Sequence, residues 1–467
     1  MESIIEDQIT IILTILRIGA KNSNLVFHLS SRLVCKAFNK LISDFPPQII
    51  IDLSLRKNTH TYLDQLISKV KISDMGLRIG FVSNAGSNGS GIPYLSKGES
   101  FIIPQTVRKL SIWTKTEILW NTPKSLTPFL PLYLQSLTLL GKFNRSLGVD
   151  PSYVNKSGYF GILPLTLEYL CLGDQFNKPI SDLPPGLSVL KLGNNFNQSV
   201  DNLPIGLSYL KLGLYFTKEL DNLPPNLSTL HIFGTRFKHP IDNLPKSLKH
   251  LSIHNSFDYD KSIDNLPLTL ETLRITTNFN QNVDSFSKLI CLKSLIFGGE
   301  FNQKIDHLGP NLLRLHLGRC FNQPIDNLPP TLLELSIGRS FNQRIDHLPS
   351  NLRRLVIGTD SIDTNNFNQP IDYLPSTLQH LYLGDCFDQP INKLPPALRY
   401  LHLDDSFDQK INELPPSLKI LEIGNNFDQK IDHLPLTLTY LKIRSYLQPT
   451  NPLPSSQSSG SNCRFTF

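Results

Sequence analysis

The sequence predicts a parallel β-solenoid of about 20-residue repeats, preceded by a small α-helical module, and hence an α+β fold overall. Three features predict it: a phenylalanine that returns mostly every 20 residues, a short alternation of leucines within each period, and a Leu-Pro pair before that alternation. A unit of this length cannot bury its own apolar side chains. Stacking such units in register gives each one the neighbours that cover its core.

The period is set by phenylalanines that recur at steps of 20 residues, with a few steps of 21, 22, 26 and 33. They are Phe143, Phe176, Phe196, Phe216, Phe237, Phe257, Phe279, Phe301, Phe321, Phe341, Phe367, Phe387, Phe407 and Phe427. Equal positions of stacked units lie about 4.8 Å apart, so we expect these rings to form one apolar column. The Asn or Asp that follows most of them is expected to form a shared hydrogen-bonded ladder; the alternative is that each forms only its own turn.

Each unit contains the pattern Leu-x-x-Leu-x-Leu or Ile, as at Leu187, Leu190 and Leu192. Its final alternation predicts a strand of about three to five residues with one face buried. The Leu-Pro or Leu-Pro-Pro before it fixes an extended backbone that cannot donate to a strand ladder. We therefore expect an extended return path, turning helical only at residues 286–292, where the Leu-Pro is missing.

The leucine pattern and the period resemble leucine-rich repeats. The recurring Phe-Asn-Gln-Pro/Lys-Ile-Asp-x-Leu-Pro segment, as in Phe321 to Pro329, closely resembles the FNIP repeat family over roughly residues 103–443. This resemblance implies a leucine-rich-repeat-like solenoid that recognises other proteins.

The N-terminal residues do not repeat. Apolar residues at three- and four-residue spacing, from Ile9 to Leu16 and from Leu25 to Leu41, predict two or three amphipathic helices. Residues 33–42 resemble the end of an F-box, which would span about residues 3–45 although its usual Leu-Pro opening is absent. The resemblance implies that the module binds a Skp-type adaptor of a cullin ligase through Leu13, Leu16, Leu25, Leu29, Val34 and Phe38. The alternative is a helical cap that covers the first strands.

Four segments are therefore expected along the chain. They are an F-box-like helical module at 1–50, a connecting and capping region with a Gly/Ser-rich linker at 51–100, the repeat solenoid at 101–445, and a disordered Ser-rich tail at 446–467. Insertions near 145–160 and 359–366 interrupt the period, and surface insertions of this kind are more often spacers than binding loops.

Composition and motifs argue against several classes of function. A net charge of +6 with no block of like charges does not indicate a nucleic-acid or membrane partner. The six cysteines form no Cys-x-x-Cys pair, which is typical of reduced thiols, so we expect a cytoplasmic protein that is not secreted. Metal, nucleophile and phosphate-binding motifs are missing, and we expect neither an enzyme nor a cofactor.

The exposed strand positions are the candidate binding surface. Basic residues and tyrosines dominate them, which favours a protein partner with an acidic or phosphorylated segment over a merely solvated face. The candidates on this concave face are Tyr209, Lys211, Arg274, Arg314, His316, Arg354, His380, Tyr382, Tyr400 and His402. The histidines predict stronger anion binding as the pH falls through about 6.5.

Two functions fit these features. The first is the substrate-recognition subunit of a Skp/cullin/F-box ubiquitin ligase, with the solenoid holding the target protein. The second is a free-standing interaction scaffold whose N-terminal helices only cap the solenoid.

Overall fold

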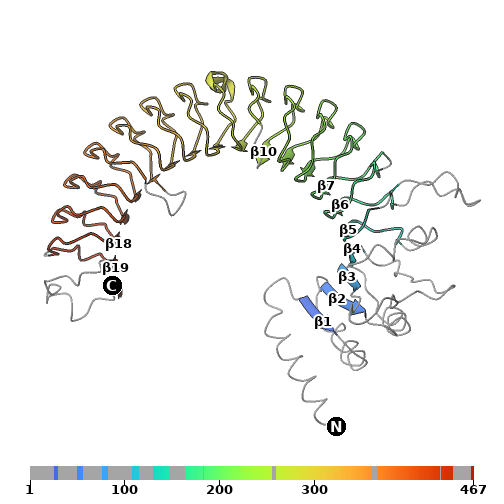
Figure 1. Cartoon of the computed structure of the whole chain (residues 1–467), viewed down its shortest axis with the longest axis horizontal. Coiled ribbons are helices and arrows are strands. Elements are labelled where there is room, and N and C mark those ends of the chain that lie inside the picture. Colours follow the sequence, from blue (N-terminus) through green and yellow to red (C-terminus); the bar gives the residue numbers. More distant parts are fainter. Residues whose placement is uncertain are drawn as a thin grey trace, which may run out of the picture. The chain divides into compact units, whose positions relative to one another are not determined.

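The structure is a computed structural model that describes residues 108–114, 130–144, 146–147, 163–181, 183–254, 259–358, 365–431 and 433–444, together with short strands at 26–29, 50–55, 76–81 and 464–466. The chain forms two units, unit 1 (Met1–Leu227) and unit 2 (Ser228–Phe467). Both contain a series of short strands, and each described repeat contributes one of them (Figure 1). In the described part of the chain, no helix is long and apolar enough to cross a membrane.

Unit 1 is a parallel sheet in which each described strand pairs with the next. The strands are β1 (Val26–Leu29), β2 (Ile50–Leu55), β3 (Gly76–Phe81), β4 (Lys109–Thr114), β5 (Ser136–Gly141), β6 (Tyr169–Leu172), β7 (Val189–Leu192) and β8 (Tyr209–Leu212). The register matches equal repeat positions, so that Leu137 lies opposite Leu170 and Leu170 opposite Leu190. The leucine pattern therefore positions the strands as predicted.

The first three strands correct the prediction for the N-terminal residues. Val26–Leu29 is a strand in parallel register with β2, where an amphipathic helix was predicted. Strands β2 and β3 pair in turn, within the region expected to be only connecting and capping. The segments VFHL and IIDLSL are rich in β-branched and aromatic residues, which suit a paired strand better than a helix. The other helices predicted before residue 100 lie outside the described residues.

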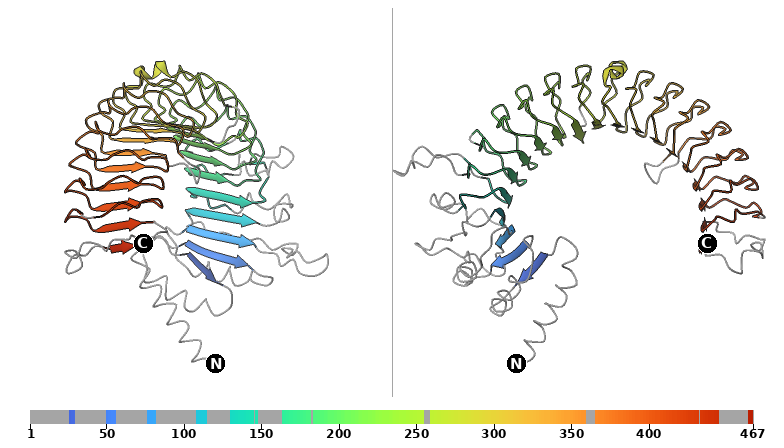
Figure 2. Two further views of the ribbon diagram at one scale, coloured as in Figure 1. Left: turned by 60° about the vertical axis from the view of Figure 1, so that its left-hand side comes forward. Right: turned by 180° about the vertical axis from the view of Figure 1, so that it is seen from behind.

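Unit 2 repeats the same arrangement (Figure 2). Its described strands are β9 (Thr229–Ile232), β10 (His250–His254), β11 (Thr272–Thr276), β12 (Ser294–Phe297), β13 (Arg314–Leu317), β14 (Glu334–Ile337), β15 (Arg354–Ile357), β16 (His380–Leu383), β17 (Tyr400–Leu403), β18 (Ile420–Ile423), β19 (Tyr440–Ile443) and β20 (Arg464–Thr466). Within this unit the strands line the concave side and the return segments the convex side (Figure 1).

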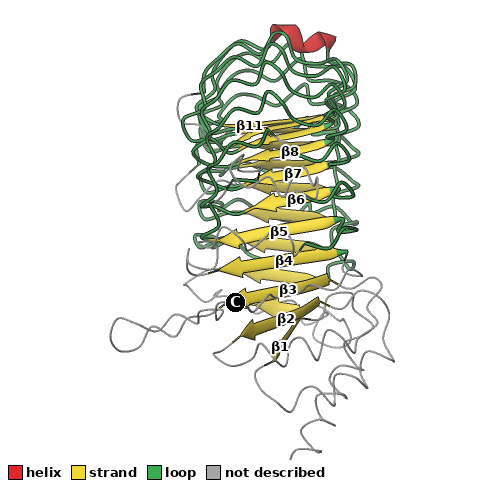
Figure 3. Cartoon of the chain, turned by 90° about the vertical axis from the view of Figure 1, so that its right-hand side faces the viewer, coloured by secondary structure: helices red, strands yellow, loops and turns green. Residues whose placement is uncertain are grey.

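Two departures in unit 2 bear on the predictions. The return segment without Leu-Pro contains a 3-10 helix, η3 (Asp284–Lys288), shown in red in Figure 3, which confirms the predicted helical turn. Strand β20 pairs in parallel with β19, so the expectation of a disordered tail is wrong for residues 464–466. Strand β19 supplies backbone hydrogen-bond partners for these residues, and the composition of the tail alone does not predict that pairing.

The predicted column of phenylalanines is confirmed within each unit. In unit 1 the ring centroids of Phe143, Phe176 and Phe196 follow one another at 5.8 and 6.1 Å. In unit 2 the column runs from Phe279 to Phe427 with successive centroids 6.0 to 6.3 Å apart. Next to Phe237 the stacked ring is that of the buried Tyr259. The predicted member of the column at this repeat, Phe257, lies outside the described residues.

The predicted amide ladder is also confirmed. The side-chain oxygen of Asn322 accepts a hydrogen bond from the backbone N–H of Asn342 at 3.0 Å and another from Nε2 of Gln343 at 3.0 Å. The same bond recurs in later units, where Asp388 accepts from the N–H of Asp408. The Asn or Asp side chain of each of these repeats thus accepts a hydrogen bond from a turn amide of the next repeat, rather than only forming its own turn.

Candidate partner-binding face

Alternation along each strand separates core from surface. In β13, Leu315 and Leu317 are buried whereas Arg314 is exposed and His316 is half-buried. The side chains that leave the core lie on the concave side of unit 2, and we call this row the strand face. It comprises Arg274, Ser294, Ile296, Arg314, His316, Glu334, Ser336, Arg354, Val356, His380, Tyr382, Tyr400, His402, Ile420 and Glu422, of which Val356 and His402 are buried.

Two of the predicted binding residues, Tyr209 and Lys211, lie on β8 of unit 1, and the other eight lie in unit 2. Beside them Nζ of Lys191 lies over the rings of Tyr169 and Tyr209, at 5.2 and 5.5 Å from their centroids. Lys191, Lys211 and Cys171 line a hollow of about 550 Å³. Burial raises the pKa of the Cys171 thiol, which keeps it protonated and unsuited to nucleophilic chemistry.

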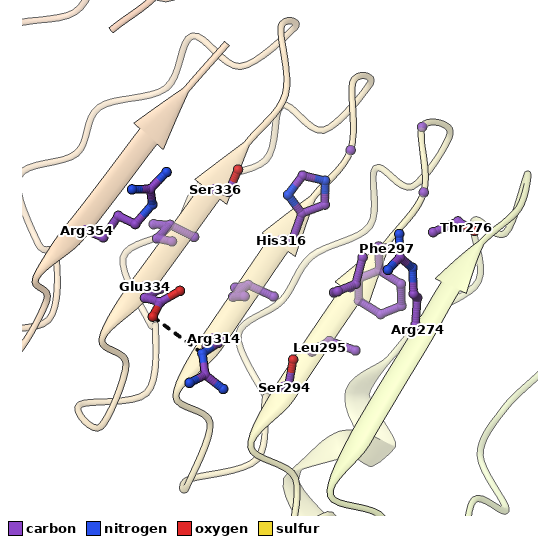
Figure 4. A pocket seen from close by; sticks show the side chains of 16 residues that line it. Arg274, Thr276, Ser294, Leu295, Phe297, Arg314, His316, Glu334, Ser336 and Arg354 are labelled. Atoms are coloured by element: carbon purple, nitrogen blue, oxygen red, sulfur yellow. Dashed lines mark hydrogen bonds and ion pairs between the residues drawn. The ribbon is translucent and has the colours of Figure 1, made fainter. Parts of the chain in front are cut away.

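The first half of the strand face in unit 2 is cationic. Arg274, Arg314 and Arg354 lie on β11, β13 and β15 and line a hollow of about 500 Å³, together with His316 (Figure 4). We call these four residues the cationic block. The buried side chains of Leu295, Leu315 and Leu335 lie between the charges. The hollow thus combines an apolar floor with charged walls, as binding surfaces commonly do.

One carboxylate partly balances this block. Nε of Arg314 lies 3.4 Å from Oε1 of Glu334, and both side chains are exposed, at 61% and 48%. For Arg274 and Arg354 the described residues contain no ion-pair partner. A solvent-exposed pair such as Arg314–Glu334 is weak, so the guanidinium groups remain able to bind an anionic partner.

The second half of the face contains His380, Tyr382, Tyr400 and His402, and it differs from the prediction. The side chain of His402 is only 9% exposed, with Nδ1 3.4 Å from Oε2 of Glu422 and Nε2 3.6 Å from Oδ2 of Asp404. The hydroxyl of Tyr382 donates to Oδ2 of Asp404 at 3.0 Å, and that of Tyr400 to Oε1 of Glu422 at 3.4 Å. The ring of Tyr382 stacks on that of His402 with centroids 4.2 Å apart. Carboxylates therefore lie beside Tyr382, Tyr400 and His402.

Three of these carboxylates lie in the turns that follow the strands. One oxygen each of Asp385, Asp404 and Asp405 lies within 4.8 Å of the other two. Burial, followed by the charge of Asp404, raises the pKa of Asp385 to about 6. The imidazole of His402, followed by the hydroxyl of Tyr382, lowers the pKa of Asp404 to about 2. We call Asp385, Asp404, Asp405 and Glu422 the acidic block.

The acidic block counts against the expectation that His380 and His402 bind anions more strongly as the pH falls. The carboxylates of Asp404 and Glu422 flank the two ring nitrogens of His402 and offset positive charge at this position. Burial, followed by the charge of Arg354, lowers the pKa of His380, so that ring stays neutral to a lower pH. Within unit 2, the prediction of anion binding therefore depends on the cationic block.

Strand alternation could not find the acidic block, because three of its members lie in turns. The available signal is a departure between repeats: Asp404 occupies the slot that glycine fills in neighbouring units, as at Gly384 and Gly424. A β-carbon at Gly424 would meet the backbone of Asp404 and Asp405, so this slot is crowded. Asp404 thus places a carboxylate at a repeat position where the neighbouring repeats have glycine.

The candidate adaptor-binding residues are placed only in part. Leu29 is the last residue of β1 and does not lie on a helix. Leu13, Leu16, Leu25, Val34 and Phe38 lie outside the described residues.

The model of the FNIP Repeat family matches residues 176–215, 216–256, 237–278, 321–360, 341–386, 367–394 and 410–446. No curated protein sequence matches the chain.

Solved structures similar to the chain include CroV588, described as a novel circular LRR protein, with 27% identity, a TM-score of 0.49, and coverage of 85% of this chain and 69% of that one. YopM from Yersinia enterocolitica has 18% identity and a TM-score of 0.45, covering 91% of each chain. The internalin InlF from Listeria monocytogenes has 18% identity and a TM-score of 0.35, covering 64% of this chain and 80% of that one. Residues 176–278, 321–394 and 410–446 thus match FNIP repeats, and the described residues fold as a parallel β-solenoid of leucine-rich-repeat-like units with one strand per repeat.

Proposed function

We propose that this protein is a non-enzymatic interaction protein whose strand face in unit 2 binds an acidic or phosphorylated segment of another protein. The observation that carries the proposal is the cationic block, in which three guanidinium groups on alternate strands line one hollow with a single carboxylate among them. Concave solenoid faces present extended binding surfaces of this kind. The widely spaced cysteines support a cytoplasmic location for such a protein.

Arginine fits this role for a geometric reason. Its planar guanidinium pairs with a carboxylate or phosphate through two parallel hydrogen bonds, and each charge-assisted bond contributes about 1.5–3 kcal/mol. Arg314 and Arg354 lie on strands two apart, which corresponds to about 10 Å, or roughly three residues of an extended ligand. Successive acidic side chains of one segment can therefore reach successive arginines.

The test is the binding of labelled acidic and phosphorylated peptides to the full chain, followed by fluorescence anisotropy. The triple variant Arg274→Gln, Arg314→Gln, Arg354→Gln should lose about ten-fold or more in affinity, since even one lost charge-assisted bond corresponds to that factor. Its control is Lys304→Gln, Lys410→Gln, Lys430→Gln, which removes equal charge from exposed return-segment positions. Equal affinities of the two triple variants would exclude the strand face as the anion site.

The narrower function of a Skp/cullin/F-box substrate receptor is a second proposal, supported only by the sequence resemblance of residues 33–42. Strand β1 lies inside the span that an F-box would occupy, and this observation counts against it. The full chain should bind a recombinant Skp adaptor if the proposal is right, and Leu13→Asp should abolish that binding while leaving thermal unfolding unchanged. A full chain that does not bind the adaptor leaves the scaffold as the function.

A further inference from the structure

We infer that the partner segment changes sign along its length, with acidic residues on the cationic block and, about three residues further on, a basic residue on the acidic block. The inference rests on the proposed function and specifies the partner of the same face. It follows from the order of charges along unit 2, from the shortage of counter-charge around the carboxylates, and from an aromatic surface beside them.

The register places the two blocks in sequence on one sheet. Arg314 lies opposite Glu334 and Glu334 opposite Arg354, whereas Arg354 lies opposite His380 on the next strand. The acidic block then begins with the turn after β16 and continues through β17 to Glu422 on β18, opposite His402. From β15 to β17 is two strand spacings, about 10 Å, which an extended chain covers in about three residues at 3.3 Å each.

The acidic block has more negative charge than the surrounding residues balance. Among the described residues, Nη1 of Arg444, a side chain 46% exposed, lies 3.9 Å from Oδ1 of Asp404, and Lys442 lies opposite Glu422 on β19, so these two cations face four carboxylates. Asp405 accepts hydrogen bonds from the backbone N–H and Nδ2 of Asn425, at 3.1 and 2.9 Å, which add no charge. Burial, followed by the charge of Asp404, raises the pKa of Asp385, so a second carboxylate beside it contributes to the shift. A cation from a partner would relieve it.

An aromatic surface lies beside these carboxylates. Tyr382 and His402 stack with an interplanar angle of 15°, and Tyr382 remains half-buried rather than fully covered. The rings of Tyr382 and His402 and the carboxylate of Glu422 lie in register on β16, β17 and β18. A guanidinium group binds well where a ring face and a carboxylate are adjacent, because it stacks on the first and donates hydrogen bonds to the second.

A partner segment of one sign fits only half of this face. Acidic residues that continue past Arg354 would meet Asp404 and Glu422, and like charges brought together oppose binding. A wholly basic segment would meet Arg274, Arg314 and Arg354 in the same way. A partner segment binds favourably to both the cationic block and the acidic block only when its own charge changes from negative to positive between β15 and β17.

The experiment compares three labelled peptides of about twelve residues on the full chain. The first carries glutamates at about every third residue, followed after about three residues by two arginines, to match the strand spacing. The second has the same composition with its arginines placed among the glutamates, and the third has glutamines in place of the arginines. The first peptide should bind about ten-fold more tightly than either of the others, whereas net charge alone predicts equal binding of the first two.

Matched variants test which residues cause the difference. Asp404→Gly and Asp385→Asn introduce residues that already occupy the equivalent positions of a neighbouring repeat, Gly424 and Asn425, so both variants should fold. Each should reduce the affinity of the first peptide towards that of the third. The control Asp174→Asn changes the equivalent slot in unit 1 and should leave all three affinities unchanged.

The outcomes separate the two proposals. If the chain binds none of the peptides, the proposed function fails for this face. If the third peptide binds as tightly as the first and Asp404→Gly has no effect, the cationic block binds anions but the inference about a change of sign is wrong. If calcium chloride, compared with EDTA, removes the advantage of the first peptide, the acidic block is a metal site and the inference is overturned.

Discussion

The ring of Phe321 lies between those of Phe301 and Phe341, at a centroid distance of 6.3 Å on each side, and is fully buried. Phe321 therefore contributes to the contacts of its repeat with both the preceding and the following repeat. Phe321→Ala should lower the free energy of unfolding by about 3–5 kcal/mol, the usual cost of truncating a buried aromatic side chain. Urea denaturation measures the change, and Tyr373→Ala, at a position 65% exposed, is the control. An unchanged midpoint for Phe321→Ala would contradict the continuous column.

The carboxyl of Asp385 gives the molecule a specific dependence of stability on pH. Its pKa is about 6 in the folded protein against 3.8 for the free group. The unfolded chain therefore releases this proton first as the pH rises, and the stabilisation present below pH 3.8 is lost by pH 6. Asp385→Asn removes this loss, so the variant should gain stability relative to the native protein across that interval. Urea midpoints at both ends check it, and a constant difference would argue against the shift.

At the scale of one element, the amide ladder joins adjacent return segments. Asn322→Ala removes the acceptor for the N–H of Asn342 and for Nε2 of Gln343. The free energy of unfolding should fall by about 0.5–1.5 kcal/mol, because water can replace the acceptor at this exposed site. Hydrogen exchange of the Asn342 amide should accelerate. Asn322→Asp should restore protection, as Asp388 does in its own unit, and equal protection in all three proteins would show that the ladder bond is not made.

Elements that recur were predictable from the sequence, and elements that occur once were not. The column of Phe321 and the ladder of Asn322 follow from a 20-residue period, because stacked units repeat every contact. Strand β1 escaped prediction because its spacing also fits a helix, and pairing with β2 decides between them. The acidic block escaped because Asp404 meets Asp385 only through the stacking of two turns. Sequence reasoning therefore placed the cationic block and missed its neighbour.

At the scale of the whole molecule, the free energy of unfolding is a sum over repeats that contact only their neighbouring repeats. Deleting residues 321–340 removes one complete period and should return Phe341 to the ring of Phe301, with β15 pairing on β13 in the same register. We expect a folded protein with the strand signal retained in circular dichroism and a cooperative thermal transition. A shorter deletion of about eleven residues from the same segment, half a period plus one residue, should unfold unit 2. It shifts the following strands out of register and interrupts the phenylalanine column. Equal behaviour of both deletions would contradict the one-strand unit.

The pairing of β20 with β19 also determines how copies of the chain behave towards one another. Strand β19 would otherwise present a bare row of N–H and C=O groups, a template onto which a strand of another molecule can add. Residues Arg464–Thr466 cover that row, and their shortness leaves little template beyond them. A chain ending at residue 445 should therefore self-associate as its concentration rises, with light scattering increasing while the full chain remains monodisperse. A truncated chain that stays monodisperse would show that β19 is protected by other means.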